Sequence, residues 1–414
     1  MQGVVSTPDS RRRSVWRSGW VALGALIAFA GALYMFLWQY RLTAEMDLKI
    51  HASIAADFDF TDLHSITSRI AYPMWHILVS ALHQLGLALE WAASLVCALF
   101  RLATFLLVCR LMDSLTAKRL HPALVALCAL IVSMVTGLYV PGCGAAGLYR
   151  FAGGSPNVWH NPTQQAVIAT MLLCIPMTVH CWEDFESRVP AEGEKTMLRW
   201  WKVILLAALL MLNLSCKPTV LQAFMPAAFL MFAVELCRRI RNWRYFGQIV
   251  LAFVPAAAYF LLQYLYYTGV VVPYTSGVEF GATPDSLFRA ARSLLLMNAF
   301  PLLAVICLWR KDLFKNRHVV LALLMVFISM LEVAFFRETG ERAGHGNFGW
   351  AAGSSSFYLW VVMLPQFADS ICSGWKKASV ARKLLYGLCA AVLVWHIASG
   401  VQYLTFLLTT GNSF

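Results

Sequence analysis

The chain has 414 residues, of which 60% are hydrophobic and only 13% are charged. Its mean hydropathy of +0.65 implies far more apolar surface than one soluble core could bury, which excludes a disordered protein, a coiled coil and a soluble enzyme. Lys and Arg number 33 against 21 Asp and Glu, a net charge of +12, which in a membrane protein indicates basic cytoplasmic loops rather than a nucleic-acid partner.

Long, continuous apolar runs predict an all-α polytopic transmembrane helical bundle that forms one integral membrane domain over residues 1–414. The first run follows Arg11, Arg12, Arg13 and Arg17 and has no small-residue cleavage site, so it is expected to stay as an anchor with a cytoplasmic N-terminus. We expect eleven spans, at residues 19–39, 91–112, 121–140, 164–182, 199–214, 217–237, 246–268, 290–309, 318–336, 354–373 and 384–408.

The distribution of basic residues gives the expected orientation. Most Lys and Arg fall in short segments that this order of spans places in the cytoplasm, namely the N-terminus, 110–121, 183–202, 238–244, 310–318 and 376–383. The C-terminus is then external, and the membrane is expected to be the inner membrane of a bacterium. The orientation requires that 73–86 does not cross, so we predict an amphipathic helix along the outer interface there. The external loops are 41–90, 141–163, 269–289 and 337–353.

The first external loop carries acidic candidates. Asp47 directly follows the first span and His51 lies one helical turn later, so both would share a face if the helix continued. A carboxylate beside an imidazole can act as a general base or hold a divalent cation such as Mg or Mn, which makes Asp47 a candidate catalytic residue and both residues candidate metal ligands. Asp57, Asp59 and Asp62 form a second acidic candidate, or else a solvated loop with helix caps.

The second external loop has the composition of a shaped, turn-rich segment. Between Arg150 and Thr163 it contains two Pro, two Gly and two Asn residues. Arg150, Trp159, His160 and Asn161 are candidate substrate contacts, because they offer a cation, a stacking surface and hydrogen-bonding groups. The alternative is a structured turn in which Asn161 caps the next helix.

Lys217 lies in a very short connection between two spans, before Pro218, which suits the first turn of a helix. A Lys on the outer side opposes the orientation bias. Phosphate binding by a point charge would explain it, and so would a side chain that snorkels to the interface. Arg101 lies within a span, where a charge is costly; it is either functional or paired with Glu332.

The last external loop combines Arg337, Arg342 and His345 with four Gly residues between 337 and 350. Backbone amides of Gly-rich turns together with Arg side chains make a site for phosphate or sugar. The three side chains are therefore candidate substrate contacts, and a flexible loop with local ion pairs is the alternative.

The architecture of residues 1–240 resembles that of GT-C superfamily glycosyltransferases, through Asp47 after the first span, the long loop 41–90 and the helix at 73–86. Asp57 and Asp59 are an alternative acidic position. The resemblance implies an external active site, a polyprenyl-phosphate-linked sugar donor, a glycan, lipid or protein acceptor of the cell envelope, and often a divalent metal.

In such a glycosyltransferase Asp47 would deprotonate or orient the acceptor hydroxyl. Lys217 with Arg337 or Arg342 would stabilise the leaving phosphate, while His51 and His160 would position sugar or metal. The external Arg and His residues also suit an O-antigen polymerase or ligase that acts on polyprenyl-pyrophosphate glycans. A glycolipid flippase or transporter is a further alternative, although we find no internal repeat.

Overall fold

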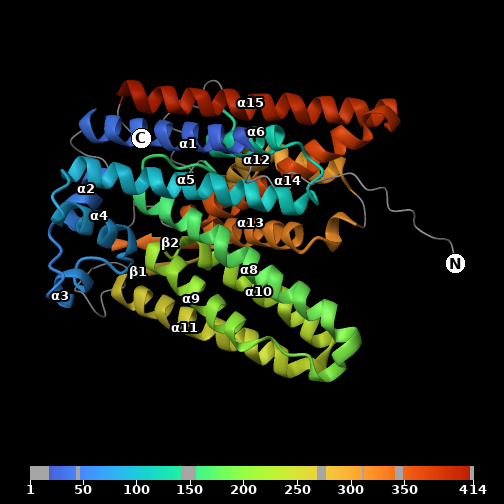
Figure 1. Ribbon diagram of the computed structural model, residues 1–414, viewed down its shortest axis with the longest axis horizontal. Coiled ribbons are helices and arrows are strands. Elements are labelled where there is room, and N and C mark those ends of the chain that lie inside the picture. Colours follow the sequence, from blue (N-terminus) through green and yellow to red (C-terminus); the bar gives the residue numbers. More distant parts are fainter. Residues whose placement is uncertain are drawn as a thin grey trace.

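The structure, a computed structural model, describes residues 18–42, 47–140, 155–267, 277–309, 312–340 and 348–410. Within these ranges the chain is all-α except for one two-stranded ribbon, and the long helices run along the longest axis of the molecule (Figure 1). The helices are α1 (Gly19–Leu42), α2 (Asp47–Ala56), α3 (Leu63–Thr67), α4 (Met74–Gln84), α5 (Leu89–Leu115), α6 (Pro122–Met134), α8 (Pro162–Glu192), α9 (Trp200–Cys216), α10 (Thr219–Arg238), α11 (Trp243–Tyr267), α12 (Pro284–Cys307), α13 (Arg317–Phe335), α14 (Gly349–Gly374) and α15 (Val380–Thr410).

Within the described ranges, eight helices are long and apolar enough to cross a membrane: α1, α5, α8, α10, α11, α12, α13 and α15. The protein is therefore a multi-pass integral membrane protein. Its outer helices expose apolar side chains such as Leu26, Leu262 and Leu384. Lipid can cover such side chains at no cost, whereas water cannot.

Three of the eleven predicted spans are not among these helices. The run predicted over 121–140 forms α6, which has only 13 residues and ends at Met134, and α9 has 17 residues. Over residues 135–140 the chain is not helical, and neighbours satisfy its backbone: Leu138 donates to the Leu296 carbonyl (2.9 Å) and Tyr139 to the Ser399 hydroxyl (2.9 Å).

The third exception is α14, which is long enough but carries the polar run Gly353 to Ser356. These residues are buried against other helices rather than exposed to lipid. A Cβ on Gly353 would lie 2.9 Å from the Ser155 carbonyl oxygen, so glycine allows the chain to approach α14 here. Since α14 faces protein on most sides, its polar groups find partners there, and it need not be uniformly apolar.

Short elements gather at one end of the bundle. Helices α2, α3 and α4 lie there together with β1 (Gly277–Phe280) and β2 (Phe336–Thr339), on the left of Figure 1. We call this the α2–α4 end. As predicted, 73–86 does not form a span: α4 has 11 residues, about 16 Å of helix, against about 30 Å of hydrocarbon.

The ribbon was not predicted, because its strands lie in two different loops. β1 pairs antiparallel with β2, with Val278 opposite Glu338 and Glu279 opposite Arg337. The turns that join α8 to α9 and α10 to α11 lie at the opposite end of the bundle (Figure 1).

Candidate functional site

The segment before α8 is held rigidly by buried polar bonds. Asn157 accepts a hydrogen bond from Arg101 Nη1 (3.0 Å) and donates to the Val135 carbonyl (2.9 Å). The Arg101 guanidinium lies 4.0 Å from the centroid of the Trp159 ring, and Trp159 is only 7% exposed. Arg101 thus holds this segment in place and does not pair with Glu332, and Trp159 lies inside the protein rather than on a stacking surface.

Asn161 joins three distant parts of the chain at the α2–α4 end. It is the N-cap of α8, where its Oδ1 accepts from the backbone N–H of Gln164 (3.0 Å). The same oxygen accepts from Lys217 Nζ (3.2 Å), while Nδ2 donates to Asp47 Oδ2 (2.9 Å). A predicted carboxylate and a predicted cation therefore meet on one amide side chain.

Lys217 is the buried cation of this group. Its side chain is 5% exposed, and Nζ lies 4.1 Å from the centroid of the Trp350 ring. Burial lowers the pKa of Lys217 to about 7, and the nearby charge of Asp47 acts in the opposite direction. The ammonium is thus held in a dry site where a negatively charged ligand group would stabilise it.

His160 contacts the same tryptophan ring as Lys217. Its ring lies 5.6 Å from that of Trp350 between centroids, and Nδ1 is 3.3 Å from the Tyr403 hydroxyl. Burial lowers the pKa of His160 to about 4, with a smaller raising effect from Asp47 and a lowering effect from Lys217. The imidazole is therefore neutral near pH 7.

A pair of histidines adjoins the group, of which His76 is buried and His51 is half-buried. His51 Nδ1 and His76 Nε2 are 2.9 Å apart, so one ring donates its N–H to the other. Burial lowers the pKa of His76 to about 3, and burial together with the charges of His76 and Lys217 lowers that of His51 well below 6.5. As the sequence predicts, His51 and Asp47 both belong to α2. We refer below to Asp47, His51, His160, Asn161, Lys217 and Trp350 as the Asp47 cluster.

These residues do not fit the divalent metal that was expected at Asp47 and His51. The cluster already contains the ammonium of Lys217, and the ring nitrogen Nδ1 of His51 is engaged by His76. A second cation would face electrostatic repulsion there. Among the described residues, no three His, Cys, Asp or Glu side chains are grouped as metal ligands.

Three predicted site residues, Trp159, Asp59 and Arg337, lie outside the cluster. Asp59 sits in an exposed turn, where bonds from the Thr61 backbone (2.8 Å) and hydroxyl (2.7 Å) lower its pKa. Arg337 lies on β2, where it pairs with Glu279 (3.3 Å). Arg150, Arg342 and His345 lie outside the described residues.

An apolar cavity of about 480 Å³ lies beside the cluster, between α10, α11, α13 and the ribbon. Its apolar walls include Leu221, Met225, Phe260, Val278, Phe336 and Phe348. Lys217 belongs to the wall of this cavity as well as to the Asp47 cluster. The site therefore joins a buried charged group to a space suited to hydrocarbon.

Three contributors were not predicted to belong to the site. Trp350, at the start of α14, contacts both His160 and Lys217, and the Gly-rich stretch before it was the only signal. His76 was noticed only as a polar residue in a short helix. Nothing in the local sequence distinguishes Tyr403 of α15, which meets His160 across 243 positions of the chain.

No family model, curated protein or solved structure matches this chain. Its function is therefore inferred from its own residues.

Proposed function

We propose that the protein is a membrane glycosyltransferase that takes a polyprenyl-phosphate-linked sugar and glycosylates a glycan, lipid or protein acceptor of the cell envelope. The observation that supports this most strongly is the double placement of Lys217, in the Asp47 cluster and in the wall of the apolar cavity. An isoprenoid chain needs an apolar channel, and a phosphate needs a cation that water does not screen.

The proposed reaction uses three side chains of the cluster. Asp47 accepts the proton of the acceptor hydroxyl as its oxygen attacks C1 of the sugar. The bond from C1 to the phosphate oxygen breaks with inversion, and the electron pair leaves on the polyprenyl phosphate. Lys217 stabilises the leaving phosphate, while Asn161 fixes the carboxylate and the ammonium relative to each other through its bonds of 2.9 and 3.2 Å.

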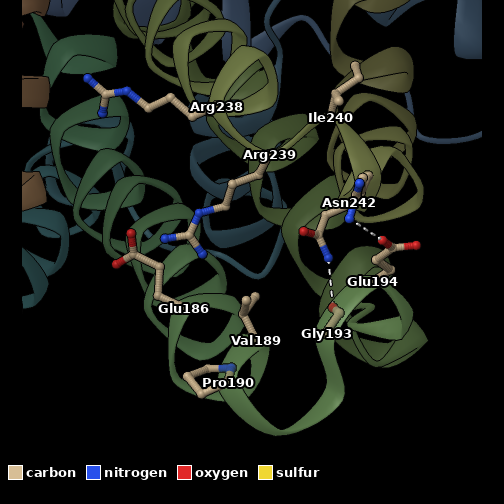
Figure 2. A pocket seen from close by; sticks show the side chains of 10 residues that line it. Glu186, Val189, Pro190, Gly193, Glu194, Arg238, Arg239, Ile240 and Asn242 are labelled. Atoms are coloured by element: carbon tan, nitrogen blue, oxygen red, sulfur yellow. Dashed lines mark hydrogen bonds and ion pairs between the residues drawn. The ribbon is translucent and has the colours of Figure 1, made fainter.

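The turn between α10 and α11, opposite the cluster, supports the proposed sidedness. It carries Arg238, Arg239 and Arg241 around a cavity of about 570 Å³, and Figure 2 shows Asn242 bonded there to the Gly193 carbonyl. All three arginines are paired, Arg238 and Arg239 with Glu235 (3.8 and 2.7 Å) and Arg241 with Glu194 (3.4 Å). By the positive-inside rule this end is cytoplasmic, so the cluster and the C-terminus are external. A lipid carrier can deliver a sugar to that side, whereas nucleotide sugars stay in the cytoplasm.

The test is glycosyl transfer by the purified protein supplied with a polyprenyl-phosphate sugar. Asp47→Asn keeps the size of the side chain but removes the base, so turnover should fall by about 100-fold or more. Asp59→Asn, in an exposed turn of the same loop, is the matched control and should behave like the wild type. Full turnover by Asp47→Asn would remove Asp47 from the mechanism.

A further inference from the structure

We propose that the apolar cavity has a second polar recognition point, the carboxyl group of Glu332, which receives a hydrogen-bond donor on the head of an amphiphilic ligand. A sugar hydroxyl and a protonated amine share this chemistry. The inference deepens the proposed function, since it concerns the head group whose phosphate would meet Lys217, and it rests on that function for the identity of the ligand.

Glu332 is placed where a charged group needs a partner. It lies one turn before the end of α13 and lines the cavity. Its Oε2 is sealed from solvent and has no hydrogen-bond partner among the described residues, and none of the ion pairs formed within these ranges includes it. Because an isolated carboxylate is costly in an apolar site, buried charges are normally paired or hydrogen-bonded.

Two glutamines extend this acceptor-rich side of the cavity. Gln263 Nε2 donates to the carbonyls of Ala71 (3.0 Å) and Leu214 (2.9 Å), which fixes its amide orientation. Its Oε1 and that of Gln222 then remain without a donor in the part of the chain that the structure describes. Both residues line the cavity with Glu332, so the buried side-chain atoms of its described lining that lack a partner are all acceptors and call for donors on a ligand.

The cavity is therefore polar in two different ways. Lys217 is the one cation among its described lining residues, and it suits a phosphate. Glu332 suits a group that donates hydrogen bonds. A phosphate-linked sugar carries both kinds of group, whereas a simple hydrocarbon carries neither. We infer that Glu332 discriminates between head groups, while Lys217 holds the phosphate.

Simple amphiphiles separate these roles, because each presents one head group on the same chain. The probes are decyl glucoside, decylamine and decyl phosphate, and their dissociation constants are measured with the full-length protein in nanodiscs. Glu332→Leu should weaken binding of the glucoside or the amine about tenfold and leave decyl phosphate unchanged. Lys217→Met should weaken decyl phosphate and leave decyl glucoside unchanged.

The conservative variant identifies the donor. Glu332→Gln keeps an acceptor oxygen but loses the charge. Retained binding of decyl glucoside would show that Glu332 accepts hydrogen bonds from sugar hydroxyls, whereas selective loss of decylamine binding would show that it pairs with an ammonium group. Glu279→Gln, on the exposed face of β1 and outside the cavity wall, is the matched control. Since Glu332 has no partner to lose, neither Glu332→Leu nor Glu332→Gln should lower the thermal unfolding midpoint.

Unchanged affinities in Glu332→Leu, or an equal loss for all three amphiphiles, would overturn the inference. If Lys217→Met instead leaves decyl phosphate binding unchanged, the proposed role of Lys217 in the glycosyltransferase is contradicted. The role of Glu332 is then judged from the binding of decyl glucoside and decylamine alone.

Discussion

Replacing Lys217 by Met should change how the stability of the protein depends on pH. Lys217 is 5% exposed, and burial lowers its pKa from 10.5 to about 7. Methionine has a similar length and no charge, and its sulfur can still pack on the Trp350 ring. The substitution therefore removes the buried charge with little loss of packing.

The sign and size follow from proton linkage. Below pH 7 both the folded and the unfolded chain hold the proton, and folding bears the full cost of burying the ammonium. Between pH 7 and 10.5 Lys217 binds its proton more tightly in the unfolded chain than in the folded one, so its contribution to the free energy of unfolding rises with pH. At about 1.4 kcal/mol for each pKa unit, the rise is at most about 5 kcal/mol.

Thermal unfolding of the purified protein between pH 7 and 10 measures this rise. The histidines of the cluster and the other titratable groups are common to the wild type and the variant, so the difference between the two curves reports Lys217. We expect Lys217→Met to be more stable than the wild type at pH 7 and the difference to shrink steadily toward pH 10. Parallel curves for the two proteins would refute the reasoning, because they would show that Lys217 keeps an ordinary pKa in the folded state.

Three further outcomes are expected. Asn161→Ala should lower the free energy of unfolding by about 2 kcal/mol, since it loses the helix cap and the bonds to Asp47 and Lys217, and Asn161→Ser should recover about half in denaturant titrations. His76→Gln should reduce the loss of stability below pH 6.5. Because the pKa of His76 is lower in the folded chain, the unfolded chain takes up the proton first, which costs the wild type about 2 kcal/mol at pH 5. Thermal scans in which the variant loses stability at acid pH as steeply as the wild type would contradict this. Glycosyl transfer should survive EDTA, because Lys217 rather than a divalent metal would hold the phosphate; restoration of activity by Mg²⁺ would show otherwise.

Physical chemistry explains which parts of the fold were predictable. A span that faces lipid must be apolar along its length, so hydropathy locates α1, α5 and α13 well. A helix such as α14, which is surrounded by protein, escapes that constraint and can carry Ser354, Ser355 and Ser356 in its buried middle. The ribbon escapes prediction for another reason, since β1 and β2 are separated by α12 and α13 and have no local turn that joins them.

Within the candidate site, too, the residues with a local sequence pattern were predictable, and those that depend on tertiary contacts were not. Asp47 and His51 could be placed on one helix face because a single turn separates them, and Lys217 stood out because a cation on the expected outer side needs a reason. Asp59 looked equally acidic in sequence, yet its carboxylate is used by the adjacent Thr61. Only a local hydrogen bond, which composition does not reveal, separates the two carboxylates.

The sequence left two interpretations of Asn161 open, and the structure is compatible with both at once. A helix cap and a substrate-site residue seemed to be alternatives, but the carbonyl oxygen of Asn161 accepts hydrogen bonds from the backbone of Gln164, the hydroxyl of Thr163 and the ammonium of Lys217 together. The amide nitrogen is then free to bind Asp47. Because the first turn of α8 fixes this side chain, the separation of carboxylate and ammonium is set by the helix itself, so a shift at the start of α8 would misplace both groups at once.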